Sequence, residues 1–374
     1  MERDNHPIIS VANRGITTLK GIEYFPNLKN LSCSKNPLDK LDVSTLTELT
    51  SLTCMADGLS ELNLYENNKL QRLNCANNQL TSLVVLSDSL TKVDCYVNKL
   101  ETLDLTSVPN LKSLRCDQNS LKSLDLSNNQ SLTSINCTYN NLTSLDLSKN
   151  TSLANVTNAM IGNQSVSLKA NFDGNMIVIP FENSNLDNDN YVSSTLDDYG
   201  DGSGFNFASF IAYDVSEIDG GIEYYCNTKL AGSENMKVSV TVSRDFHQVS
   251  FYADSENTSL IGRAFANDGQ SVTAPEIKNP PQCKVLDTWS DTLDNVTGDK
   301  SIYANWKDAH SYSLSSFSND TATVKCSACG DTFTLSFINT VNSKKGDEKY
   351  SPYLDVTKDG VINAKDYALL NKMK

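Results

Sequence analysis

The chain has 374 residues, more than one ordinary domain needs, so its length predicts two to four domains. Its formal net charge is −14, which argues against a nucleic-acid binder because such proteins carry basic stripes. No run of 18 apolar residues predicts a transmembrane helix, and the opening MERDNHPIIS lacks the apolar core of a signal peptide. Either the protein is cytosolic, or it is a mature secreted or surface protein from which the signal and any anchor have been removed; the modules described below favour the second.

A phrase of about eleven residues recurs from residue 28 to residue 156. It begins with the leucines Leu28, Leu49, Leu70, Leu90, Leu111, Leu132 and Leu153, at steps of 21, 21, 20, 21, 21 and 21 residues. The pattern LxxLx(L/C)xxNxL with a period in the twenties predicts a leucine-rich-repeat solenoid. We assign residues 28–160 to this solenoid and residues 1–27 to its N-terminal cap, because a terminal repeat would otherwise expose core.

Within each repeat, the first, fourth, sixth and eleventh positions are predicted to point inward. Cysteine fills the sixth position, and we expect these side chains to be buried free thiols that pack as small hydrophobes: Cys33, Cys54, Cys75, Cys95, Cys116 and Cys137. The ninth position should satisfy backbone groups of the turn; it holds Asn36, Asp57, Asn78, Asn98, Asn119 and Asn140. A second phrase, such as TSLDLSKN, predicts strands or extended turns on the opposite wall.

The outward positions of the repeat strands form a candidate binding face. Most are small and polar, but a central group has the residue types of binding hot spots: Arg72, Lys92, Asp94, Tyr96, Arg115 and Asp117, with Tyr139 nearby. Because the concave sheet of a solenoid is where such proteins usually bind, we expect a protein or glycan to bind there. An ordinary hydrated sheet face is the alternative.

The 21-residue repeats resemble those of internalin-type and gut-bacterial surface proteins. Residues 161–244 then read as short strands, which predicts a small β-sandwich. In internalin-type proteins an immunoglobulin-like domain occupies this position. The acidic runs DNDN (187–190) and DDYGDG (197–202) are either a calcium site or a solvated loop.

Residues 245–307 resemble the B-repeat of internalins. The matching stretches are VSFY, VTAPE, DNVTGD and the closing SIYANW. This resemblance implies a compact β-grasp-like module that serves as a spacer or an adhesive element of a surface protein.

Residues 308–335 contain His310 and a CxxCG sequence formed by Cys326 and Cys329. They form a linker element that resembles the HxY…CxxCG segments of clostridial surface proteins. A structural zinc site needs four ligands and only three are visible, so Zn²⁺, a disulfide and free thiols all remain open.

The segment 336–374 contains a twelve-residue calcium loop. Its oxygen ligands for Ca²⁺ would be Asp355, Thr357, Asp359, the Val361 carbonyl, Asn363 and Asp366. Gly360 permits the sharp turn at the sixth position. The phrase DVxxDGxINxxD resembles one dockerin repeat, although a dockerin has two. The resemblance implies attachment to a cohesin module of a cellulosome or cell-surface scaffold, with contacts at Ala364 and Lys365.

We therefore expect a mainly β chain: a solenoid, a β-sandwich, a β-grasp-like module and a short helical calcium module. The predicted function is that of a non-catalytic extracellular binding or adhesion protein. The alternatives are a surface stalk without a specific ligand, or a cysteine-dependent hydrolase that uses Cys226 with His247.

Overall fold

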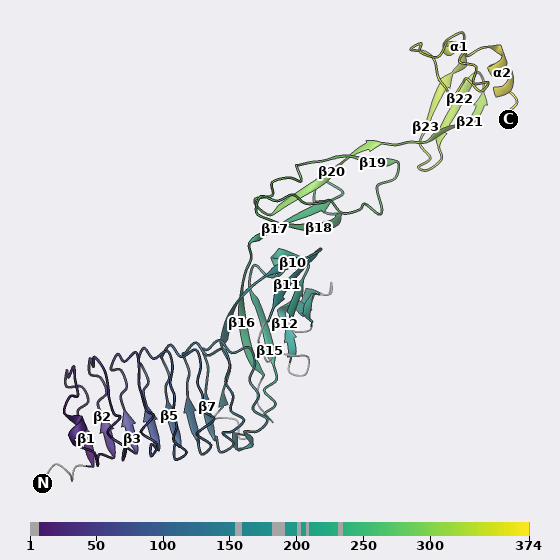
Figure 1. The fold of residues 1–374 in the computed structure, drawn as a ribbon. Coiled ribbons are helices and arrows are strands. Elements are labelled where there is room, and N and C mark those ends of the chain that lie inside the picture. Colours follow the sequence, from purple (N-terminus) through teal and green to yellow (C-terminus); the bar gives the residue numbers. More distant parts are fainter. Residues whose placement is uncertain are drawn as a thin grey trace. The chain divides into compact units, whose positions relative to one another are not determined.

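The computed structural model describes residues 7–153, 159–181, 191–199, 203–206, 209–230 and 235–373. The chain divides into two compact units, Met1–Asp245 and Phe246–Lys374. Among the described residues of both units, strands far outnumber helices and the helices are short, which confirms the mainly β prediction (Figure 1). No helix within the described residues is long and apolar enough to cross a membrane.

Eight short strands of the first unit form one parallel sheet in chain order (Figure 1). They are β1 (Ile8–Ser10), β2 (Asn30–Ser32), β3 (Ser51–Thr53), β4 (Arg72–Asn74), β5 (Lys92–Asp94), β6 (Ser113–Arg115), β7 (Ser134–Asn136) and β8 (Ala159–Met160). Equivalent positions of successive repeats pair with each other, as Asn30 does with Ser51. This register confirms the predicted solenoid. Strand β1 belongs to the expected cap, so the cap extends the sheet by one strand.

The interior of the solenoid consists of the repeated leucines and cysteines. All six repeat cysteines are free and 0 % exposed. Burial raises the pKa of these thiols, to about 12 at Cys75 and Cys137. The thiolate that reactivity requires is therefore suppressed, and the cysteines pack as small hydrophobes, as predicted.

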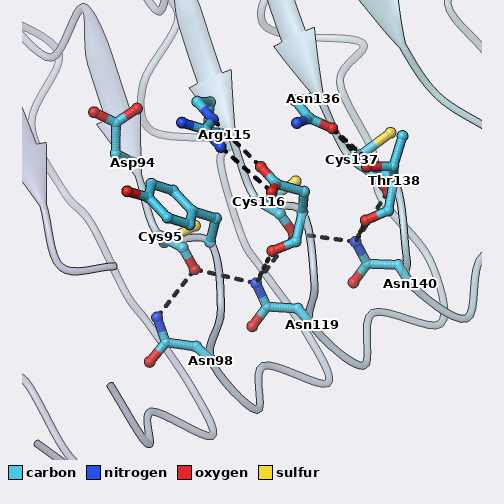
Figure 2. A network of polar contacts seen from close by, with 12 residues as sticks. Asp94, Cys95, Asn98, Arg115, Cys116, Asn119, Asn136, Cys137, Thr138 and Asn140 are labelled. Carbon is cyan, nitrogen blue, oxygen red and sulfur yellow. Dashed lines mark hydrogen bonds and ion pairs between the residues drawn. The ribbon is translucent and has the colours of Figure 1, made fainter. Parts of the chain in front are cut away.

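The asparagines of the ninth position form a ladder that follows the solenoid (Figure 2). The Asn140 Nδ2 donates to the carbonyls of Cys116 and Cys137, both at 3.0 Å, and its Oδ1 accepts the Leu121 N–H at 3.0 Å. Asn98 and Asn119 repeat this arrangement one coil apart. Each side chain therefore pairs backbone groups of two adjacent coils that the sheet does not reach.

One rung of the ladder is an acid. Asp57 is 1 % exposed and accepts the Asn36 N–H at 2.8 Å, but a carboxylate has no N–H with which to donate to the carbonyls. Burial raises the pKa of this carboxyl. We expect Asp57→Asn to raise the free energy of unfolding at neutral pH by about 1–2 kcal/mol, since the amide supplies the missing donors and removes a buried charge.

The pH dependence of this gain follows from the raised pKa of Asp57. The protonated carboxyl stabilises the fold fully below its unfolded pKa of about 4, and this stabilisation is lost as the pH rises through the folded value. The advantage of Asp57→Asn, measured by urea unfolding, should therefore grow from about pH 4 to about pH 7. The exposed Asp39→Asn serves as the control and should change little. A variant less stable than the original chain at neutral pH would contradict this account.

The residue before each rung has a left-handed backbone. Asn13 of the cap has a φ of 53°, and the residues before the rungs have φ between 54° and 61°: Lys35, Ala56, Asn77, Val97, Gln118, Tyr139 and Asn163. The last of them precedes Gln164, whose Nε2 donates to the carbonyls of Cys137 at 3.0 Å and Ile161 at 2.9 Å. Gln164 is thus the final rung, and it is also the first residue of the next sheet.

The opposite wall of the solenoid is formed by extended turns, one of the two predicted alternatives, with one isolated bridge between Val84 and Asp104 among the described residues. A second asparagine ladder holds this wall. Asn129 donates to the carbonyls of Leu105 at 3.1 Å and Val108 at 2.9 Å. Asn67 and Asn150 make the same kind of contacts.

Two four-stranded sheets follow within the first unit, with strand orders β10-β11-β14-β13 and β12-β15-β16-β9. Their strands are β9 (Gln164–Lys169), β10 (Asn171–Asp173), β11 (Met176–Pro180), β12 (Tyr191–Ser194), β13 (Gly204–Asn206), β14 (Ser209–Ala212), β15 (Ile222–Cys226) and β16 (Met236–Ser243). Phe210 of one sheet packs on Tyr224 of the other, with ring centroids 5.4 Å apart. The Tyr224 hydroxyl donates to the Thr143 carbonyl at 2.6 Å, so this part contacts the last repeat. An immunoglobulin-like domain stays a prediction.

Short 3-10 helices complete the first unit. They are η2 (Ile22–Tyr24), η3 (Thr151–Leu153), η5 (Thr195–Tyr199) and η6 (Val215–Glu217).

The second unit begins with a mixed sheet of order β18-β17-β20-β19. Its strands are β17 (Phe246–Tyr252), β18 (Leu260–Asn267), β19 (Lys284–Trp289) and β20 (Lys300–Asp308). Val249, Phe251 and Ile302 are fully buried in its core. No helix occurs between residues 246 and 308, all of which the structure describes. The β-grasp-like assignment stays a prediction.

The expected linker element at 308–335 is instead a folded three-stranded sheet. It consists of β21 (Tyr312–Ser318), β22 (Thr321–Cys326) and β23 (Thr332–Ser336). The helices α1 (Phe337–Thr340) and α2 (Ala364–Leu370) follow. Phe317 and Ala322 of the sheet share one buried core with Phe337, Ile362 and Leu370. The sheet and the C-terminal segment 336–374 thus fold around common apolar side chains, which is why no linker separates them.

Candidate binding face and metal sites

Five of the seven predicted binding residues lie together on the outward face of the solenoid sheet. We call Lys92, Asp94, Tyr96, Arg115 and Asp117 the face patch. The register of β5 and β6 places Asp94 directly beside Arg115. The period of the repeat therefore brings residues about 21 positions apart into one cluster.

The charged side chains of the face patch pair with one another and with the Tyr96 ring. The Arg115 guanidinium carbon lies 4.0 Å from the centroid of the Tyr96 ring, a cation–π contact. The Arg115 Nε also pairs with the Asp117 Oδ1 at 3.4 Å, and the Lys92 Nζ pairs with the Asp94 Oδ2 at 3.1 Å. The two aspartates are buried, whereas the side chains of both cations are almost half exposed. A partner would therefore meet the cations and the ring, with the acids beneath them.

Arg72 and Tyr139 are less closely tied to the face patch. Arg72 is exposed and pairs in the sheet with Lys92, so it lies at the edge of the patch. Tyr139 is 59 % exposed and occupies a left-handed position of the turn. Within the described residues, no hydrogen bond, ion pair or ring contact joins either side chain to the patch.

The sequence analysis missed Met55 as a neighbour of Tyr96. The Tyr96 hydroxyl lies 3.7 Å from the Met55 Sδ. Between them, the equivalent position of the intervening repeat holds the small, buried Ala76, so the Tyr96 side chain extends across that repeat. The sequence signal for this contact is a small residue between two large ones at equivalent positions of three successive repeats.

Hollows occur on the opposite wall of the solenoid. One has a volume of about 470 Å³ and a neighbour has about 480 Å³; both are lined by Lys40 and Asp42. Tyr65, which is 57 % exposed, lines the first of them. This wall provides a comparison surface for experiments on the face patch.

The predicted calcium loop brings three carboxylates together. One oxygen each from Asp355, Asp359 and Asp366 lies within 4.8 Å of the others. Asp355 is 4 % exposed and accepts the Gly360 N–H at 2.9 Å and the Tyr350 hydroxyl at 2.6 Å. The Tyr350 hydroxyl is the largest cause that lowers the pKa of Asp355, so this carboxyl is held ionised.

The remaining predicted ligands line the same loop. The Thr357 Oγ1 lies 3.2 Å from the Asp355 Oδ1 and 2.9 Å from the Asp366 Oδ1. Asn363 and Asp366 form the capping box of α2, and Gly360 has the positive φ of 82° that the sixth position requires. This all-oxygen donor set fits a hard cation such as Ca²⁺. Ala364 and Lys365 are exposed in the first turn of α2.

The three zinc candidates of the sequence are also brought together, and a fourth residue joins them. Cys283, His310, Cys326 and Cys329 each place one ligand atom within 4.8 Å of the others. The backbone N–H of Cys329 lowers the pKa of the Cys326 thiol to about 5, whereas contact with the Cys329 thiol raises that of Cys283 to about 12. The sequence analysis missed Cys283, which lies 43 residues before Cys326.

The hydrolase candidates Cys226 and His247 and the acidic runs remain among the predicted site residues. The buried Cys226 Sγ faces the Thr143 carbonyl at 3.9 Å, and burial raises its pKa to about 12, the opposite of an activated nucleophile. The His247 Nε2 lies 3.1 Å from the Asp268 Oδ1. The acidic run 187–190 and residues 200–202 lie outside the described residues; Asp197 accepts the Ser194 N–H at 2.8 Å.

The chain is similar to several solved structures from Listeria monocytogenes. One is the functional domain of InlJ, which includes a cysteine ladder, at 22 % identity over 63 % of this chain and 67 % of that chain, with a TM-score of 0.33. InlP gives 20 % identity over 63 % and 70 %, with a TM-score of 0.36. The internalin inlF gives 22 % identity over 44 % and 57 %, with a TM-score of 0.33. No protein-family model matches this sequence, and no curated protein matches it either.

Proposed function

We propose that this chain is a non-catalytic, extracellular binding protein that uses the face patch to hold a protein or glycan on another surface. The observation that carries the proposal is the Arg115 guanidinium stacked 4.0 Å from the Tyr96 ring above two buried aspartates. Tyr and Arg are enriched among residues that dominate binding energy. Side chains that are already held in place lose less conformational freedom when a partner binds.

The C-terminal loop gives this proposal its second part. Asp355, Thr357, Asp359, Val361, Asn363 and Asp366 would hold one Ca²⁺, and the ordered loop would attach the chain to a cohesin-type scaffold. Ala364 and Lys365 would contact that scaffold, because both are exposed at the start of α2. This arrangement would place the chain at a cell surface or in a cellulosome, with the solenoid as its binding element.

The test is a screen of the intact chain against arrays of glycans, extracellular proteins and cohesin modules, each in Ca²⁺ and in a Ca²⁺ chelator. We expect a protein or glycan to bind the chain in both conditions, since the face patch contains no calcium ligand. Cohesin binding should appear only with Ca²⁺. Failure of every probe in both conditions would contradict the proposal and favour a stalk without a ligand.

A further inference from the structure

We infer that Cys283, His310, Cys326 and Cys329 form a structural Zn²⁺ site in the second unit. The Cys283 and Cys326 Sγ atoms are 3.4 Å apart, and the Cys329 Sγ lies 3.3 Å from the His310 Nδ1. With Zn–S near 2.3 Å and Zn–N near 2.0 Å, tetrahedral ligands are separated by roughly 3.5–3.8 Å. Small movements of these side chains would therefore complete the coordination.

The donor set selects the metal. Three thiolates and one imidazole form a Cys₃His set, which is a closed, four-coordinate structural zinc arrangement. Soft sulfur ligands disfavour Ca²⁺ and Mg²⁺, which prefer oxygen. When the ion binds, the thiols that are still protonated release their protons to solvent, and a thiolate then occupies each sulfur position.

The backbone of the CxxCG turn at residues 326–330, which we call the knuckle, supports this arrangement. The Gly330 N–H donates to the Cys326 carbonyl at 3.0 Å and closes the turn, and Gly330 has the positive φ of 80°. The Cys326 N–H also donates to the Asp331 carbonyl at 2.8 Å, so backbone hydrogen bonds fix both ends of this turn.

The fourth ligand is held against the knuckle by contacts of its own neighbours. The Gln282 side chain donates to the Ala328 carbonyl, and the Ala309 N–H donates to the Cys283 carbonyl at 2.8 Å. Cys283 has a left-handed φ of 58°, a conformation that residues other than glycine rarely adopt. Metal ligation is a reason for a cysteine to be kept there.

The histidine also has outer partners. His310 presents Nδ1 to Cys329, its Nε2 lies 3.9 Å from the Asp308 Oδ1, and its ring stacks on Tyr312 with centroids 5.0 Å apart. A zinc-bound histidine usually donates its second N–H to such a carboxylate, which fixes the tautomer and the ring. The site would join the start of β19 to the turn between β22 and β23, and so would cross-link two sheets of the second unit.

The experiment uses the full chain, expressed with zinc and purified without chelator. We expect elemental mass spectrometry to find about one zinc per chain. Replacement of the ion by Co²⁺ should give the sulfur-to-cobalt charge-transfer band and the strong visible bands of a tetrahedral site. A chain without zinc whose intact mass is lower by two hydrogens would overturn the proposal, because it would show a disulfide instead.

Variants locate the ion. Cys283→Ser, Cys329→Ser and His310→Asn should each weaken zinc binding by about tenfold or more, measured by competition with a chromophoric chelator. Cys283 and Cys329 are chosen because they are half-buried. Substitution of the buried Cys326 is more prone to prevent folding. His247→Asn and Asp347→Ala, which change residues outside both proposed metal sites, should leave the zinc content unchanged. Zinc retained at full affinity in Cys283→Ser would also overturn the proposal.

Discussion

Asn140→Ala is expected to lower the free energy of unfolding of the first unit by about 3–5 kcal/mol. The Asn140 side chain is 2 % exposed and pairs three backbone groups: the carbonyls of Cys116 and Cys137 and the N–H of Leu121. Alanine leaves all three without that partner in a place that water does not reach. Each buried polar group left unpaired costs about 1–3 kcal/mol.

The measurement combines urea unfolding with amide hydrogen exchange at Leu121. Exchange of that amide should accelerate more than exchange elsewhere in the solenoid, because its acceptor is the Asn140 Oδ1. Asn128→Ala is the matched control, since Asn128 is exposed and the substitution is the same; it should change stability by less than about 0.5 kcal/mol. Equal effects of the two variants would show that the ladder does not hold the coils.

Asp355→Ala should abolish Ca²⁺ binding, with a loss of affinity of about 100-fold or more. Asp355 is the first predicted ligand of the loop, and one of its carboxylate oxygens lies within 4.8 Å of oxygens of Asp359 and Asp366. Three carboxylates at this separation repel one another unless a cation lies between them. Removal of the Asp355 carboxylate would take away a negatively charged ligand and also the acceptor of the Gly360 N–H.

Isothermal titration calorimetry of the full chain checks this prediction. The original chain should bind one Ca²⁺, and Asp347→Ala should bind it equally, because Asp347 is an exposed acid of the same module outside the loop. No heat from the original chain would refute the calcium loop. Unchanged binding by Asp355→Ala would place the ion elsewhere.

The solenoid could be predicted because its buried residues recur in the sequence with a fixed period. A leucine at every first position and a cysteine at every sixth specify which side chains are buried, and the register follows from the period alone. The ninth-position asparagines were predicted for the same reason. The second ladder of Asn67, Asn129 and Asn150 was missed, although Asn129 and Asn150 are also 21 residues apart. A search for period among polar residues would have found it.

The end of the solenoid shows where periodicity fails. Gln164 donates to the same kind of backbone carbonyls as a ladder asparagine. Its side chain is longer, however, and it lies outside the repeat pattern. The contact of Tyr224 with Thr143, 81 residues earlier, depends on how two sheets pack on the last repeat. Such packing is a tertiary property that no local pattern specifies.

The Cys₃His cluster could be predicted only in part. His310, Cys326 and Cys329 lie within 20 residues and have a recognisable spacing, whereas Cys283 directly precedes β19, a strand of another sheet. The antiparallel pairing of β19 with β20 places Lys284 opposite Asp308, and so brings Cys283 next to the segment that contains His310. A strand register of this kind cannot be deduced from a single cysteine.

The face patch is the proposed binding surface of this chain. The most direct test measures the affinity of the intact chain for the protein or glycan that the array identifies, before and after paired substitutions. Tyr96→Ala combined with Arg115→Lys, which keeps the positive charge beside the buried Asp117, should weaken binding by about tenfold or more. Tyr65→Ala on the opposite wall should leave it unchanged. Binding that survives the first change, or that is lost with the second, would contradict the account.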